Sequence, residues 1–202
     1  MAHAWTRRAG ILALAMAAAL TACAPTYTLV NPAPIGVAKN TIMVTPGTSW
    51  NRSPNGAFDV AWEENWTENG PMLDSIGFIG GLPDGQAIAK QRVKDDRQVP
   101  VFHTDMSPQD LVSMLESYYR IKAGATTFET KGIQPATFVG KPGLRFDYAY
   151  VGADNVKRRG RAVIAIADTK LYMMTLDAAE LHYFAAALPE FEAMAAAASA
   201  KS

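Results

Sequence analysis

The stretch RAVIAIADTKLYMMTLDAAELHYFAAALPEFEAMAAA, residues 161–197, decides the fold of this protein. It begins with the second half of a predicted strand at 156–167. The short polar turn Asp168-Thr169-Lys170 follows, and then the apolar run LYMMTL at 171–176. Two such runs joined by so short a turn predict a pair of antiparallel strands. From residue 177 onward the pattern predicts a helix, so this stretch alone contains a hairpin followed by a helix.

The helix is predicted from its first turn and from its apolar stripe. Asp177 suits the N-cap position, and Glu180, three residues later, completes the pattern of a capping box. The residues of the apolar stripe are Leu181, Phe184, Leu188, Phe191 and Ala195. Pro189 interrupts this segment, which predicts a kink or two short helices that meet there.

A third strand is expected directly before the hairpin. The segment LRFDYAYV at 144–151 alternates in polarity, and GADN at 152–155 has the composition of a turn. A turn centred on GADN predicts three cross-strand pairs of an aromatic with a basic residue: Tyr150 with Lys157, Tyr148 with Arg159, and Phe146 with Arg161. One face of the sheet would then bind anionic headgroups or an acidic partner. In the alternatives, the rings pack under a helix while the basic stems reach solvent, or a one-residue slip reverses the pattern.

Segments before residue 144 supply further strands and one helix. Strands are expected at 41–45, 58–62, 72–79 and 86–93, of which the last two flank the turn Pro83-Asp84-Gly85. The helix is expected at 107–124, where Ser107 suits the N-cap and Pro108 the first helical position. Residues 63–70, which include three acids and Trp66, are interpreted as a loop. In the more common arrangement its tryptophan belongs to the core and its acids face solvent; in the alternative, the loop docks a partner or a sugar.

The grouping of these elements indicates the fold class. Strands joined by tight turns pair antiparallel, and helices that stand apart from them favour an α+β protein over alternating βαβ units. The order of elements resembles the Mog1/PsbP-like fold, and residues 161–197 carry the resemblance, because there a hairpin leads through LYMMTL into a terminal helix. The resemblance implies an antiparallel β-sheet flanked by α-helices. Since members of that family serve as assembly or binding factors, it also implies a non-catalytic role.

The N-terminal sequence has the pattern of an export signal. Arg7 and Arg8 precede an apolar run at 11–20 that is too short to span a bilayer of about 30 Å. The tetrapeptide Leu20-Thr21-Ala22-Cys23 resembles the lipobox of bacterial lipoproteins. This resemblance implies that residues 1–22 are a removed signal peptide and that Cys23 carries a diacylglycerol and usually a further acyl chain.

Lipidation of Cys23 would determine both location and chemistry. The residue directly after the cysteine is Ala24 and not an aspartate. By the sorting pattern of enterobacterial lipoproteins, this resembles a protein that is sent to the outer membrane. We therefore expect an anchor in the inner leaflet of the outer membrane, facing the periplasm. Residues 23–40 are predicted to be a tether with a mean reach of about 20–25 Å, followed by one domain at 41–202. Cys23 is the only cysteine, so its acylation leaves no thiol for catalysis, a disulfide or a metal.

The net charge that remains after removal of the predicted signal peptide indicates which classes of partner to expect. Removal of residues 1–22 leaves 17 basic and 19 acidic residues, a formal charge of −2, which gives no electrostatic reason to expect nucleic acid. The expected partners are the membrane, through the lipid anchor, and an envelope protein.

Catalytic candidates are weak. His103 and Asp105, in the segment FHTD, would provide a general base held by a carboxylate, or Thr104 and Asp105 merely fix the loop before the helix. No G-x-S-x-G motif and no zinc-ligand spacing is present, so we expect no metal and no cofactor other than the covalent lipid. The favoured hypothesis is a non-catalytic, membrane-tethered binding or assembly domain. The alternatives are a periplasmic hydrolase or lyase that uses His103 and Asp105, and a carrier of small apolar or anionic ligands.

Overall fold

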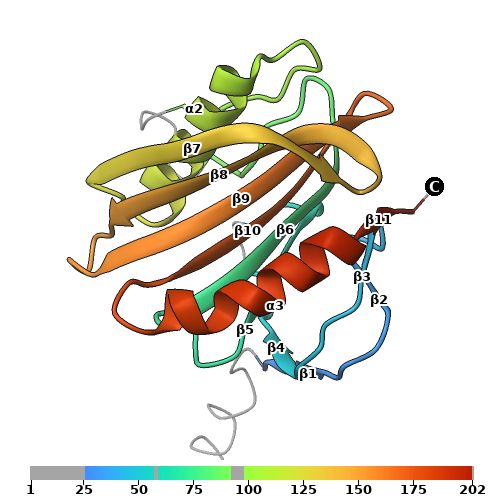
Figure 1. The fold of residues 1–202 in the computed structure, drawn as a ribbon. Helices are drawn as coiled ribbons and strands as arrows, with labels where there is room; N and C mark the ends of the chain where they lie inside the picture. Colours follow the sequence, from blue (N-terminus) through green and yellow to red (C-terminus); the bar gives the residue numbers. More distant parts are fainter. Residues whose placement is uncertain (1–25, 57–58, 92–97, 202) are drawn as a thin grey trace, which may run out of the picture.

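A computed structural model describes residues 26–56, 59–91 and 98–201 and contains a large antiparallel sheet (Figure 1). Every neighbouring pair of strands in this sheet is antiparallel. The strands, in spatial order, are β1 (Thr28–Val30), β4 (Trp50–Arg52), β5 (Glu63–Thr67), β6 (Asp74–Pro83), β10 (Lys170–Ala179), β9 (Lys157–Ala167), β8 (Lys141–Val151) and β7 (Thr127–Phe138). The predicted meander of three C-terminal strands forms the centre and one flank of the sheet.

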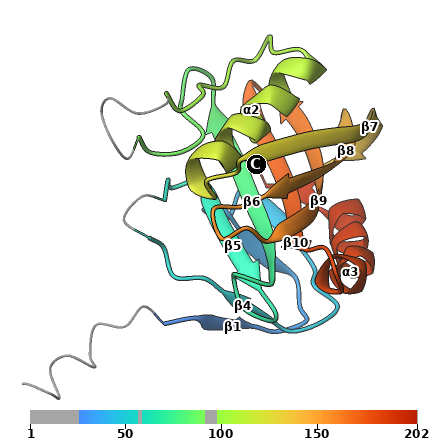
Figure 2. The same cartoon turned by 90° about the vertical axis from the view of Figure 1, so that its left-hand side faces the viewer.

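The two described helices cover opposite faces of this sheet, as Figures 1 and 2 show together. They are α2 (Pro108–Lys122) and α3 (Tyr183–Ala197). A second, small sheet lies beside the end of α3 and consists of β2 (Ile35–Val37), β3 (Ile42–Val44) and β11 (Ser199–Ala200). The predicted fold class, an antiparallel α+β sandwich, is confirmed.

Each face of the sheet has its own hydrophobic core. Under α2, the sheet contributes Phe146, Tyr148 and Ile164 to one buried cluster. Under α3, Met174 and Trp66 belong to the other cluster. Because successive side chains of a strand point to opposite faces, both cores are supplied by alternate residues of the same strands.

Helix α2 forms where the sequence predicts it. The Ser107 side chain accepts a hydrogen bond from the backbone N–H of Asp110, and the Asp110 carboxylate accepts one from the backbone N–H of Ser107. This reciprocal arrangement is a capping box. Glu116 and Arg120 form an i,i+4 ion pair at 2.8 Å.

The predicted register between the strands at 144–151 and 156–167 is wrong by one residue. The connection comprises the five residues 152–156 where four were expected, so Tyr148 pairs with Gly160 and Tyr150 with Arg158. A Cβ atom at Gly160 would overlap the ring of Tyr148. Glycine at this position therefore allows the tyrosine to lie across β9 and favours the observed register.

The predicted start of the terminal helix is also wrong. Asp177 lies inside β10, which pairs with strands on both sides and continues to Ala179. Helix α3 begins at Tyr183 after His182, and His182 makes no side-chain capping bond. Pro189 lies within one continuous helix and does not separate two short ones.

The N-terminal boundary of the domain must be corrected as well. Residues 28–37, predicted as part of a tether, contain β1 and β2, which pair with β4 and β3. The Val37 side chain is fully buried, and the Ala38 backbone N–H donates to Glu64 at 3.0 Å. Apolar residues of this segment thus belong to the core, and any flexible tether must end before Thr28.

Further strand boundaries differ between residues 58 and 93. Phe58 and residues 92–97 lie outside the described part, and the described residues of 86–93 contain a single isolated bridge, from Ala87 to Val101, instead of a strand. Residues 63–67, predicted as part of a loop, form β5 with Trp66 fully buried. The predicted signal peptide at 1–22, Cys23 and Ala24 also lie outside the described residues. Within the described part, no helix has the length and apolarity needed to cross a membrane.

Candidate functional site: an apolar cleft and two polar cavities along helix α2

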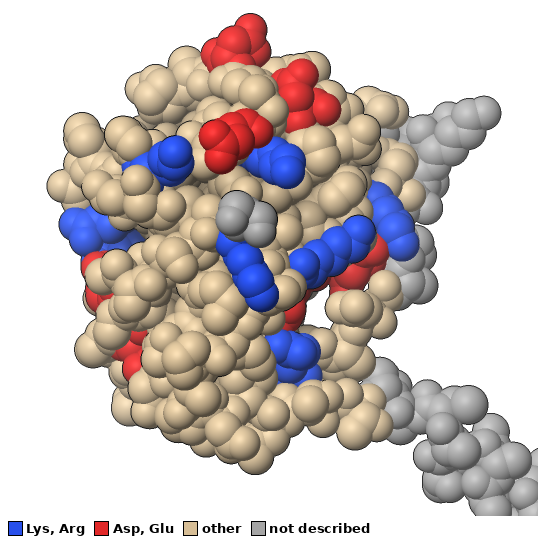
Figure 3. Space-filling model, turned by 90° about the vertical axis from the view of Figure 1, so that its right-hand side faces the viewer, with Lys and Arg blue, Asp and Glu red and all other residues tan. Residues whose placement is uncertain are grey.

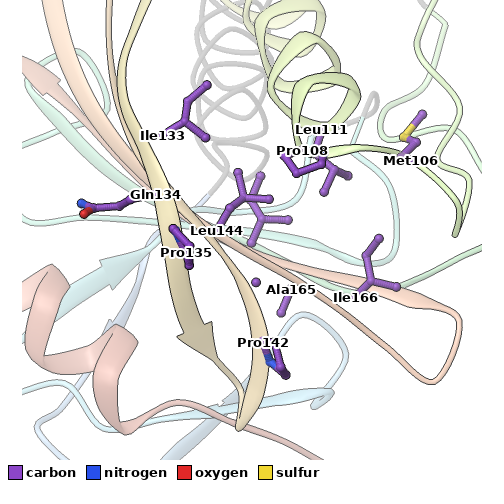
Figure 4. A pocket seen from close by; sticks show the side chains of 12 residues that line it. Met106, Pro108, Leu111, Ile133, Gln134, Pro135, Pro142, Leu144, Ala165 and Ile166 are labelled. Carbon is purple, nitrogen blue, oxygen red and sulfur yellow. The ribbon is translucent and has the colours of Figure 1, made fainter.

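An open apolar cleft of about 400 Å³ lies between the first turn of α2 and the sheet (Figure 4). The residues that line it are Met106, Pro108, Leu111, Ile133, Gln134, Pro135, Pro142, Gly143, Leu144, Ile164, Ala165 and Ile166. Gln134 is the only lining residue with a polar side chain, and its amide points away from the other lining side chains (Figure 4). The side chains that line the cleft are therefore almost all apolar, and the cleft is open to solvent.

Irregular backbone at the outer strands forms one wall of this cleft. The register between β7 and β8 shifts between Lys131 and Gln134, where Gly132 adopts a φ of +65°. The shift leaves the Ile133 side chain 43% exposed at the rim. At the floor, a Cβ atom at Gly143 would overlap the carbonyl oxygen of Ile164, so glycine permits close packing of β8 on β9.

Two polar cavities lie at the other end of α2, where the helix–sheet interface changes from apolar to charged. Their volumes are about 390 and 310 Å³, and both are lined by Pro71, Lys122, Ala123 and Asp177. We call these two spaces the Asp177 cavities. In contrast to the cleft, their linings include carboxylates, tyrosines and two cations, Lys122 and Arg158.

Lys122, in the last turn of α2, organises the first group of polar residues. Its Nζ atom lies 2.8 Å from Oδ1 of Asp59 and 2.9 Å from Oε1 of Glu63, whose side chain is 1% exposed. Tyr118 and Asn65 also donate to Glu63, at 2.7 and 3.1 Å. Burial alone would raise the pKa of Asp59, but the hydrogen bond from Lys122 holds this pKa below its usual value.

A chain of tyrosines forms the second group. The Tyr148 hydroxyl donates to the carbonyl of Leu176 at 2.9 Å and therefore accepts from the Tyr119 hydroxyl at 2.6 Å. Tyr150 donates to Oδ2 of Asp177 at 2.5 Å. Burial raises the pKa of each of these three tyrosines, so they remain protonated donors at physiological pH.

Asp177 is the residue with an incomplete set of partners. Its Oδ1 atom is inaccessible to solvent and has no hydrogen-bond partner among the described residues. Burial raises the pKa of Asp177 to about 6, and the hydrogen bond from Tyr150 and the charge of Arg158 offset this only in part. Arg158 is itself held by Asp154, with its two terminal nitrogens at 2.9 and 2.7 Å from the carboxylate oxygens.

The predicted aromatic and basic face does not exist as one surface. Tyr148 and Tyr150 lie buried under α2, whereas Arg161 pairs with Asp147 on β8 and Glu192 on α3. Arg159 lies 4.6 Å from the ring centre of Phe184 on α3, and Lys157 is exposed. The one-residue register shift separates the rings from the basic groups, as expected when a strand slips by one position.

Charged side chains are also dispersed on the side of the molecule where the β7–β8 and β9–β10 hairpins turn (Figures 1 and 3). Basic side chains are spread over mostly uncharged surface there, and acidic side chains gather mainly toward its upper and left-hand edges (Figure 3). This side therefore carries no single field of one sign. We locate the candidate sites in the concave regions along α2 instead.

The structure does not bring His103 and Asp105 together as a catalytic pair. His103 Nδ1 lies 3.8 Å from Oδ1 of Asp84, and both side chains are 54% exposed. Thr104 also donates to Asp84, from its backbone N–H and from its hydroxyl. Asp84, in the turn after β6, thus fixes this loop, and neither His103 nor Asp105 lines the cleft or the Asp177 cavities.

The sequence patterns did not predict the residues that define the apolar cleft and the Asp177 cavities. Asp177 was interpreted as a helix cap and Glu63 as part of a loop, because each is an acidic residue at the edge of a periodic segment. Pro135 and Gly132 conceal the strand nature of β7, since proline and glycine weaken strand patterns. A signal was nevertheless present in the alternation of Met173, Thr175 and Asp177 along one face.

The arrangement of one antiparallel sheet between α2 and α3 is a PsbP-like fold. The solution structure of cyanobacterial PsbP (CyanoP) from Synechocystis sp. PCC 6803 matches with a TM-score of 0.57 at 14% identity, over 89% of this chain and 96% of that chain. The crystal structure of LpqN, involved in cell envelope biogenesis of Mycobacterium tuberculosis, gives a TM-score of 0.42 at 11% identity, over 87% and 92% of the two chains. No family model matches the sequence, and a comparison with curated proteins finds no match either.

Proposed function

We propose that this protein is a lipid-anchored envelope lipoprotein whose PsbP-like domain binds, without catalysis, a ligand that carries an aliphatic chain. The open apolar cleft between α2 and the sheet is the observation that carries the binding role. Its volume of about 400 Å³ falls within the usual range for small-molecule sites. The resemblance of residues 20–23 to a lipobox supports the anchor.

The composition of the cleft favours an aliphatic chain over a peptide. A bound peptide would bury backbone N–H and C=O groups, which need hydrogen-bond partners. The only polar side chain of the lining, Gln134, points away from the other lining side chains (Figure 4). An aliphatic chain requires no such partners and is stabilised by about 25 cal/mol for each Å² of apolar surface removed from water.

The proposed location follows from the same N-terminal pattern. Ala24 after Cys23 supports sorting to the inner leaflet of the outer membrane, with the domain in the periplasm. There the lipid on Cys23 keeps the domain near acyl chains, and an envelope protein is the proposed partner to which the domain presents its ligand. Two acyl chains or more on one residue give stable anchoring, whereas one chain gives only marginal binding.

A fluorescence titration with cis-parinaric acid tests the binding role. We expect saturable binding to the purified domain and at least tenfold weaker binding by Ile133→Asp, because a buried carboxylate at the rim opposes an apolar ligand. The matched control is Leu181→Asp, which changes a fully exposed leucine outside the cleft. Absence of saturable binding, or equal losses in both variants, would refute the binding role.

A Cys23→Ser variant tests the anchor. We expect unprocessed precursor and no incorporation of a labelled fatty acid, because serine offers no thiol for the diacylglycerol. Normal processing together with continued acyl labelling would show that the resemblance to a lipobox is misleading.

A further inference from the structure

The Asp177 cavities form a second concave region, separate from the apolar cleft and different in chemistry. The cleft is at the first turn of α2, whereas the cavities contact Lys122 in its last turn. Asp177 is the carboxylate residue that lines both cavities, so a ligand in either one would lie beside it.

The charges around these cavities are paired except at Asp177. Lys122 is neutralised by Asp59 and Glu63, at 2.8 and 2.9 Å. Arg158 is held by both oxygens of Asp154. In the described part of the chain, no cation lies within ion-pair distance of Asp177. Around the cavities, four carboxylates (Asp59, Glu63, Asp154 and Asp177) thus face two cations, so two negative charges are not balanced by the cations of this region.

Among the residues that the structure describes, one oxygen of the Asp177 carboxylate lacks a hydrogen-bond donor, just as the carboxylate lacks an ion-pair partner. Tyr150 donates to Oδ2, but the buried Oδ1 has no donor among the described residues. Buried carboxylate oxygens normally have partners, so an unpaired one in a residue that lines two cavities calls for an explanation. The missing partner is a hydrogen-bond donor, and a positively charged donor would also balance the charge.

The aromatic lining favours a cation over a neutral hydroxyl compound. Tyr27, Tyr118 and Tyr119 contribute to one cavity and Tyr150 to the other. The faces of tyrosine rings attract cations that lie within about 6 Å of the ring centre. Lys122 already lies 5.8 Å from the centre of the Tyr118 ring, which shows that an ammonium group is accommodated at this wall.

We propose that the Asp177 cavities bind a compound with a protonated amine, whose ammonium group pairs with Asp177 and lies against the rings of Tyr118 and Tyr119. A free amine and an aminated lipid headgroup share this chemistry. Binding requires the ionised carboxylate, and burial raises the pKa of Asp177 to about 6. The groups that face Asp177 are Tyr119 on α2, Tyr148 and Tyr150 on β8, Arg158 on β9 and Asp154 in the loop between β8 and β9. Affinity should therefore fall as the pH is lowered through about 6.

An NMR titration of the ¹⁵N-labelled protein with n-butylammonium, n-butanol and n-butyrate tests the proposal. At pH 8 we expect n-butylammonium to bind at least tenfold more tightly than n-butanol, to shift the amide signals of Tyr118, Tyr119 and Asp177, and to bind about tenfold more weakly at pH 5. Vesicles with and without phosphatidylethanolamine then distinguish a headgroup from a free amine. The comparison of ligands uses the unaltered protein, so it does not depend on whether a variant folds.

Variants provide the second arm of the experiment. Asp177→Asn keeps the shape of the side chain and removes its charge, and we expect at least a tenfold loss of n-butylammonium affinity. Asp84→Asn is the matched control, because Asp84 is a carboxylate that lines neither cavity. Equal affinity for the amine and the alcohol, no binding of the amine, or unchanged affinity in Asp177→Asn would each overturn the proposal.

Discussion

Tyr150 and Asp177 form a hydrogen bond across β9, from the phenolic hydroxyl on β8 to Oδ2 on β10, at 2.5 Å. The other carboxylate oxygen of Asp177 is buried and has no hydrogen-bond partner in the part of the chain that the structure describes. A carboxylate in this setting opposes folding at neutral pH, because burial penalises its charged form. Such groups are concentrated at functional sites, where stability is sacrificed for binding or chemistry.

Replacement of Asp177 by Asn should stabilise the protein at neutral pH. The pKa of Asp177 is about 6 in the folded state and 3.8 when unperturbed. The folded state therefore binds more protons between these values, so the free energy of unfolding falls as the pH rises from about 4 to 6 and is constant above. We expect Asp177→Asn to gain about 1–3 kcal/mol at pH 8 and much less at pH 4, measured by urea unfolding. Lower stability than wild type at pH 8 would contradict this.

Removal of the Tyr150 hydroxyl should have the opposite effect. In Tyr150→Phe the Asp177 carboxylate loses the hydrogen bond that Tyr150 donates, and hydrogen bonds to charged groups contribute about 1.5–3 kcal/mol. The loss should be larger at pH 8 than at pH 4, where Asp177 is protonated. Tyr172→Phe, on the other face of β10, serves as the control and should show no such pH dependence. Equal losses at both pH values in Tyr150→Phe would rule out this role of the hydroxyl.

The contact of Gly160 with Tyr148 should determine the register of β8 and β9. A Cβ atom at residue 160 would overlap the tyrosine ring, so Gly160→Ala should cost about 1–3 kcal/mol. In a Tyr148→Ala background the same substitution should cost much less, which a double-mutant cycle measures as a coupling energy. A coupling of zero would mean that the ring does not determine the requirement for glycine.

Arg161 should act as a structural link between the sheet and α3. Its guanidinium binds both oxygens of Asp147, at 2.5 and 2.9 Å, and also pairs with Glu192. Arg161→Met should lower stability by about 1–2 kcal/mol, and less in 1 M salt, because its side chain is partly exposed. The exposed Lys157 provides the control, since Lys157→Met should change stability by less than about 0.5 kcal/mol. A loss in the lysine variant as large as in Arg161→Met would show that general basic charge, and not the link, is responsible.

Much of the fold followed from local patterns in the sequence. The hairpin between β9 and β10 was predictable because two apolar runs flank the short polar segment at 168–170. In the structure, Asp168 and Thr169 form a two-residue turn with positive φ at both positions, a geometry that fits the twist of paired strands. Helix α2 was predictable because its cap, Ser107, lies directly before its apolar stripe. These features depend on residues that are neighbours in the sequence, so one amino-acid sequence is sufficient to predict them.

The candidate sites depend on residues distant in sequence and were not predictable in the same way. Glu63 and Lys122 lie 59 residues apart, and Tyr150 and Asp177 lie 27 apart. The register of β8 on β9 rests on the fit of one ring over Gly160, which no periodicity reveals. A slip of one residue was enough to move every basic group of the predicted surface to the other face of the sheet.

The central claim, that the cleft between α2 and the sheet binds an aliphatic chain, is tested most directly by methyl NMR of the protein with spin-labelled stearate. The account predicts that the methyl signals of Ile133, Leu144 and Ile164, which line the cleft, broaden at low ratios of ligand to protein. The signals of Ile42 and Ile76, which lie in the core under α3, should remain sharp. Broadening of both sets alike, or of neither, would contradict the account.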